Sequence, residues 1–106
     1  MAWLYLVVAG ALEVVWATAM KQSEGFTRAG PTALMIVTML GSFGLLAMAM
    51  RVLPLGTAYA IWTGIGALGA FAVGVVALGE AANPMRIVAV TLIVAGLALM
   101  RLSAEA

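Results

Sequence analysis

The sequence predicts an all-α membrane protein with four transmembrane helices, and three observations lead to this fold class. Of the 106 residues, 66% are hydrophobic and only 8% are charged, whereas a soluble domain has about 45–50% apolar and about 25% charged residues. The apolar residues fall into four long runs. Short connections that contain proline, glycine or asparagine separate the runs, so no segment remains for a soluble domain.

The four apolar runs define the expected helices. We expect them at about 2–20, 32–50, 57–78 and 85–101, in one domain that covers residues 1–106. A membrane-spanning helix needs about 20 residues, with a range of roughly 17–25, and the first three runs meet that length. In the fourth run Arg86 and Arg101 enclose only fourteen uncharged residues. Either both arginines extend to the lipid headgroups, or this helix is short and a partner helix shields it.

Prolines and glycines divide the chain between these runs. Pro31, Pro54 and Pro84 each fall near the start of a run, where proline suits the first helical turn. Because the connections are short, sequential helices should be antiparallel neighbours in a compact four-helix bundle. Gly64 and Gly66 predict a bend in the third helix.

The basic residues at the helix ends are almost evenly divided between the two membrane faces. One face carries Arg51 and Arg101, and the other carries Lys21, Arg28 and Arg86. The positive-inside rule therefore gives no clear orientation. Either the spans are wrongly assigned, or the chain inserts both ways up. The second interpretation predicts an antiparallel homodimer that contains an inverted pair of chains.

Small residues on the fourth helix mark a surface for close approach. Thr91 and Ala95 are four residues apart and Gly96 is adjacent, a pattern that favours close helix packing in lipid. Four short helices are too few to enclose a polar pathway alone. We therefore expect contact with a second copy of the chain.

Glu13 is the candidate functional residue. It is the only charged side chain between Met1 and Met20. Acids at membrane depth are costly and usually face a cavity or a partner, so such an acid is interpreted first as a functional site. The alternative is a protonated Glu13 that only joins helices by hydrogen bonding.

Residues three or four positions apart share a face of a helix. Gly10 and Trp16 therefore lie beside Glu13, and Gly10 leaves room next to the carboxyl group. With no cysteine and no histidine in the chain, the usual zinc sites are excluded, and no metal is expected.

Three polar or aromatic side chains of other helices could complete a pocket: Ser42, Tyr59 and Trp62. Each has a simpler interpretation. Tyr59 and Trp62 could be membrane-interface residues without a functional role. Ser42 could bond a backbone carbonyl of its own helix, one turn back.

A lone carboxyl group in an apolar span suits the exchange of protons for cations. Its ionised form needs a cation and its protonated form holds none, so proton and cation compete. Aromatic faces add cation–π attraction. The sequence contains no P-loop, so an ion gradient is the expected energy source and no cofactor is predicted. A net charge of +1 does not suggest nucleic acid as a partner.

Several motifs resemble the small multidrug resistance transporters over essentially the whole chain. They are Gly10-x2-Glu13, Lys21 at the end of the first helix, and the run PLGTAYAIWTGIG from Pro54 to Gly66. The segment EVVWA, which begins at Glu13, resembles the guanidinium exporter subtype. Members that export bulky cations typically have glycine at the position of Trp16, and a tryptophan there narrows the site.

The resemblance implies a transporter, not an enzyme, in the bacterial inner membrane. It implies an antiparallel, dual-topology homodimer with one Glu13 from each subunit in a shared pocket. It also implies proton-coupled antiport of guanidinium or a small guanidinyl cation. The residues that support the carboxylates would be Trp16, Ser42, Tyr59 and Trp62, and the fourth helix, with Ala95 and Gly96, would carry much of the dimer contact.

Three other functions remain open at this point. The first is a broad exporter of quaternary ammonium and other cations from the same family, against which Trp16 argues. The second is a proton-carrying subunit of a rotary motor, although such subunits are normally two-helix hairpins. The third is a subunit of a larger membrane complex that does not transport.

Overall fold

Residues 1–103 fold into four helices. The computed structural model describes residues 1–103, and its helices are α1 (Ala2–Gln22), α2 (Ala29–Ala49), α3 (Leu55–Ala77) and α4 (Pro84–Ser103). All four are long and apolar enough to cross a membrane, with mean hydropathy between 1.6 and 2.0. This confirms the predicted all-α fold with four transmembrane helices.

The prolines lie where the helices begin. Pro54 precedes α3 in an extended conformation, and Pro84 is the first residue of α4. α2 begins at Ala29, three residues earlier than predicted, and Pro31 lies within its first turn. Because the first backbone N–H groups of a helix have no partner in the helix, proline costs little at that position.

The connection between α3 and α4 has a defined conformation. Gly79 has φ +72°, a left-handed conformation that glycine adopts without strain. The backbone N–H of Glu80 then donates to the carbonyl of Gly74 at 2.9 Å. The side chain of Asn83 accepts from the backbone N–H of Arg86 at 2.9 Å, which caps the start of α4.

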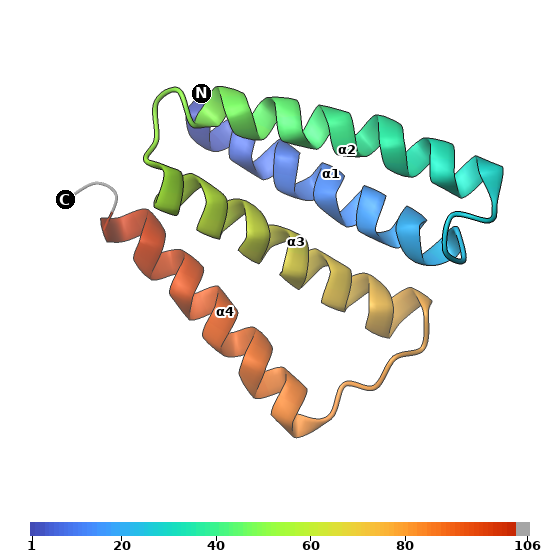
Figure 1. Ribbon diagram of the computed structural model, residues 1–106. Coiled ribbons are helices and arrows are strands. Elements are labelled where there is room, and N and C mark those ends of the chain that lie inside the picture. The colour runs from blue at the N-terminus through green and yellow to red at the C-terminus, as the bar shows by residue number, and fades with distance from the viewer. Residues whose placement is uncertain (104–106) are drawn as a thin grey trace.

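The four helices form an open layer. Figure 1 shows α3 beside the pair formed by α1 and α2, with α4 on the far side of α3. The described chain measures 45 × 35 × 16 Å along its principal axes. The prediction of a compact four-helix bundle is therefore wrong for the single chain. The physical reason is that lipid tails are as apolar as the helix surfaces, so no hydrophobic effect forces the helices to close.

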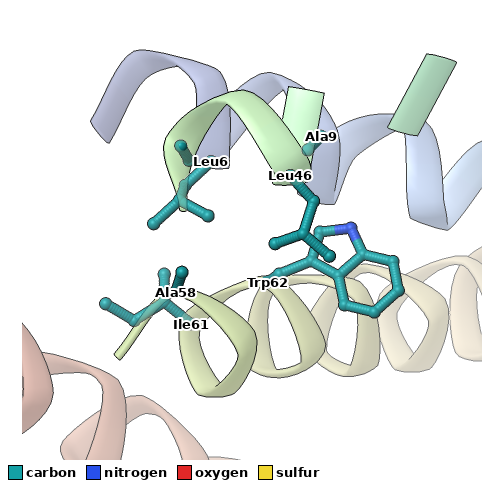
Figure 2. Packing of buried hydrophobic residues seen from close by; sticks show 7 residues of the cluster. Leu6, Ala9, Leu46, Ala58, Ile61 and Trp62 are labelled. Carbon is teal, nitrogen blue, oxygen red and sulfur yellow. The ribbon is translucent and has the colours of Figure 1, made fainter. Parts of the chain in front are cut away.

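The best-packed region joins α1, α2 and α3. Its side chains come from the first half of α1, the second half of α2 and the first half of α3, and six of them are labelled in Figure 2. The cluster consists of Leu6, Ala9, Leu46, Ala49, Ala58, Ile61 and Trp62. The three alanines are completely buried. Small side chains bring the helix backbones close together, as is usual between membrane helices.

α4 packs against the other helices most closely near its C-terminal end. A Cβ atom on Gly64 of α3 would lie 2.5 Å from Cδ2 of Leu97, so the glycine is what lets α4 approach. Near the end of α4, the guanidinium of Arg101 lies 4.4 Å from the centre of the Trp3 ring. Toward the α3–α4 connection the two helices separate (Figure 1). Within residues 1–103, no residue of α4 is buried.

Candidate functional site

The carboxyl group of Glu13 lies against α3. Gly66 is buried, and a Cβ atom at this position would overlap the carboxyl group of Glu13. Glycine at position 66 is therefore what allows the acid to fit between the helices. Glu13 Oε1 is buried and has no hydrogen-bond partner within residues 1–103. Because buried polar atoms are nearly always paired, this oxygen is a candidate to bind a proton or a cation.

Ser42 connects three helices. Its hydroxyl is completely buried and donates to the backbone carbonyl of Ala9 on α1 at 2.7 Å. It also accepts from Nε1 of Trp62 on α3 at 2.9 Å. The alternative that Ser42 bonds a carbonyl of its own helix is therefore wrong. The hydroxyl reaches α1 because α1 packs closely against α2 here. The carbonyl oxygen of Ala9 can accept this bond in addition to its helical bond, because it has two lone pairs.

Four aromatic rings form a row across the three packed helices. The centroid of Tyr59 is 5.5 Å from that of Trp62, Trp62 is 5.8 Å from Phe43, and Phe43 is 6.2 Å from Trp16. Such distances are typical of favourable ring pairs. Ser42 fixes the ring of Trp62 through its indole N–H, so one buried hydroxyl orients the centre of this aromatic row.

The ends of the aromatic row differ from its centre. Trp62 is only 6% exposed, whereas Tyr59 is 52% exposed. Trp62 is therefore not a membrane-interface residue in this chain. That alternative remains open for Tyr59. Trp16 Nε1 is buried and, like Glu13 Oε1, has no partner in the described part of the chain. One face of α1 therefore carries both a donor and an acceptor that could bind a further group.

The remaining predicted site residues have other contacts. A Cβ atom on Gly10 would overlap the side chain of Ile65, so the space beside Gly10 is filled by α3 and is not left open next to the acid. α3 is α-helical through Gly64 and Gly66, and both glycines provide close contacts. The bend predicted at these two positions stays a prediction.

Three predicted dimer-contact residues lie away from the site. Thr91, Ala95 and Gly96 are exposed on α4, and a Cβ atom on Gly96 would meet nothing within 4 Å in the described chain. Their assignment to a dimer contact stays a prediction.

Sequence reasoning missed two residues that shape the site. Phe43 lies between the two tryptophan rings, and Ile65 packs on Gly10. An apolar residue within an apolar run has no distinguishing feature in the sequence. The neighbouring Ser42 was the only local signal that this part of α2 faces the other helices.

Within residues 1–103, four helices long enough to span a membrane and a buried acid without a partner are typical of a small multi-pass membrane transporter. The sequence profile described as Small Multidrug Resistance protein matches residues 1–93. The chain belongs to the small multidrug resistance family, and it is a transporter and not an enzyme. This membership argues against both subunit interpretations, the rotary-motor subunit and the non-transporting one.

Several relatives are similar along nearly their whole length. The chain is 53% identical to a guanidinium exporter of Escherichia coli strain K12 over 103 residues, which cover 97% of this chain and 98% of the relative. It is 52% identical to guanidinium exporters of Citrobacter freundii and Salmonella typhimurium, with the same coverage.

The role of Ser42 can be tested by removing its hydroxyl. In Ser42→Ala, the indole N–H of Trp62 loses its partner in a buried position. We expect the free energy of unfolding in detergent to fall by about 1–3 kcal/mol, the cost of an unpaired buried polar group. The emission of the tryptophans should change as well, because Trp62 is no longer fixed.

Thr63→Ala is the matched control. It also removes one hydroxyl, but that hydroxyl is exposed and donates only to its own helix, at the carbonyl of Tyr59. An equal loss of stability in both variants would contradict the connecting role of Ser42.

Proposed function

We propose that this chain is a proton-coupled antiporter that exports guanidinium across the bacterial inner membrane. The observation that carries the proposal is the carboxyl group of Glu13, which lies in an apolar span with a buried oxygen that has no partner within residues 1–103. The similar guanidinium exporters come from bacteria, which supports both the substrate and the membrane.

Competition at Glu13 is the basis of the exchange. An ionised carboxylate is costly in the membrane unless a positive charge lies beside it. A bound proton removes the negative charge and a bound cation balances it. The two cannot occupy the same oxygen together. If the site opens to one side of the membrane at a time, loading by one ion requires release of the other. The proton gradient then drives export.

Guanidinium has the chemistry that such a site would favour. It is planar and always charged, and its paired N–H groups fit a carboxylate through two parallel hydrogen bonds. Its flat face can stack on an aromatic ring. The aromatic row includes Trp16, three residues from Glu13 on the same helix, so a ring and a carboxyl group occur close together.

A second copy of the chain would complete the site. The single chain is an open layer and leaves both Glu13 Oε1 and Trp16 Nε1 without partners in the described residues. α4 exposes Thr91, Ala95 and Gly96, whose small side chains suit a helix contact in lipid. The nearly balanced charge of the two membrane faces favours an antiparallel homodimer. Two Glu13 residues would then exchange up to two protons for one guanidinium, so that transport moves net charge.

The test is substrate-induced current in proteoliposomes that contain only this protein. We expect guanidinium to produce current and a bulky quaternary ammonium to produce none. Exchange without net current would contradict the two-proton stoichiometry. Equal currents with both cations would favour the second candidate, a broad cation exporter, which the family description also fits.

Glu13→Gln should abolish coupled transport. Glutamine preserves the size of the side chain over Gly66 but cannot bind and release a proton, so the current with guanidinium should disappear. Gel filtration and thermal unfolding in detergent should match those of the wild type. Normal proton-driven export by this folded variant would disprove the mechanism.

Trp16→Gly should widen the range of substrates. Removal of the indole ring opens space beside Glu13 and shortens the aromatic row, so bulkier cations should begin to produce current. The ratio of the currents with quaternary ammonium and guanidinium measures this change. An unchanged ratio would show that Trp16 does not set the selectivity.

A further inference from the structure

A second site lies beyond Glu13 on the same pair of helices. A cavity of about 300 Å³ is lined by residues of α1, α3, the α3–α4 connection and the start of α4. This volume is at the lower end of the range of ligand pockets. Its lining includes Ala17 and Ala70, each one helical turn beyond Glu13 and Gly66, respectively. The cavity therefore begins about one helical turn from the central acid and continues toward the ends of α1 and α3.

The outer part of this cavity already holds a guanidinium group, that of Arg86. Its Nη2 lies 4.0 Å from Oε1 of Glu80, and its central carbon lies 5.4 Å from the centre of the Phe71 ring. Its Nη1 donates to the carbonyl of Ala81 at 2.8 Å. A carboxylate and an aromatic face are the two groups that recognise a planar cation of this kind.

The backbone fixes the position of Glu80. Its N–H donates to the carbonyl of Gly74, and a Cβ atom on Gly74 would lie only 2.5 Å from Glu80 Oε1. Gly74 thus makes room for the carboxylate, as Gly66 does for Glu13. Gly79, with its left-handed backbone, turns the chain so that Glu80 folds back onto α3.

Arg86 is held loosely by Glu80. A charge-assisted hydrogen bond between nitrogen and oxygen is about 2.7–2.9 Å long, and the separation here is 4.0 Å. The two side chains are 43% and 45% exposed, and exposed ion pairs contribute little to stability. A free guanidinium ion can therefore displace Arg86 and bind Glu80 through two hydrogen bonds.

We propose that Glu80 and Phe71 form an outer binding site for guanidinium, which Arg86 occupies until the substrate displaces it. This inference rests on the proposed export of guanidinium. It adds an intermediate binding site between the membrane surface and Glu13. Lys21 also lines the cavity, and its positive charge weakens the binding of a cation. Guanidinium therefore stays at the outer site only briefly. Weak binding there is needed if the ion is to move on to Glu13.

The concentration dependence of the guanidinium current tests the outer site. Glu80→Gln should raise KM about two- to fivefold, the effect of one partly exposed ionic contact, with the maximal current retained. Arg86→Gln should lower KM, because it removes the competing group. Glu24→Gln is the matched control, since it removes an acid from the same membrane face outside the cavity lining and should leave KM unchanged.

A binding measurement separates this inference from the proposed function. In Glu13→Gln the central acid is absent, and guanidinium chloride should still shift the NMR signals of the Arg86 side chain and the Glu80 amide. Equal sodium chloride should not shift them, and adding Glu80→Gln should remove the effect. No shift with guanidinium would overturn the outer site, as would an unchanged KM in both cavity variants. Absence of current in the wild type would contradict the export function, and the NMR result would still decide the outer site.

Discussion

The contact between the Glu13 carboxyl group and Gly66 places an ionisable group inside an apolar helix pair. The absence of a side chain at position 66 is what allows the acid to lie between α1 and α3. Within the described residues, the buried Glu13 Oε1 has no hydrogen-bond partner. In lipid such an acid needs a proton or a cation, and the proposed exchange follows from that need.

The helices around Glu13 differ in how closely they pack: α1, α2 and α3 share a buried cluster, and α4 contributes no buried residue within residues 1–103. Ser42 joins α1, α2 and α3 and fixes the ring of Trp62, which places the aromatic row across the packed helices. α4 packs on α3 near Gly64 and on Trp3 through Arg101, and none of its residues is buried within residues 1–103. A closely packed three-helix unit with an exposed fourth helix fits the proposed dimer, in which a second copy would cover the exposed surface of α4.

The four helices could be predicted from the sequence because long apolar runs with very few charges permit little else in a membrane. Glu13 could be predicted because a charge in such a run is conspicuous. The open arrangement could not, since apolar composition does not say which helix faces touch. For the same reason, the contacts of Phe43 with the tryptophan rings and of Ile65 with Gly10 could not be predicted. The alternative acceptor considered for Ser42, a carbonyl of its own helix, was wrong. The roles of the glycines as contact points depend on the neighbouring helix, which local spacing does not identify.

Proton release on guanidinium binding tests the central claim most directly. Purified protein in weakly buffered detergent solution would be mixed with guanidinium, and the protons released would be counted by a pH indicator. Competition at Glu13 predicts that guanidinium binding releases protons, and that its affinity rises with pH until Glu13 is fully ionised. If guanidinium released no more protons from the wild type than from Glu13→Gln at any pH tested, the result would contradict the account.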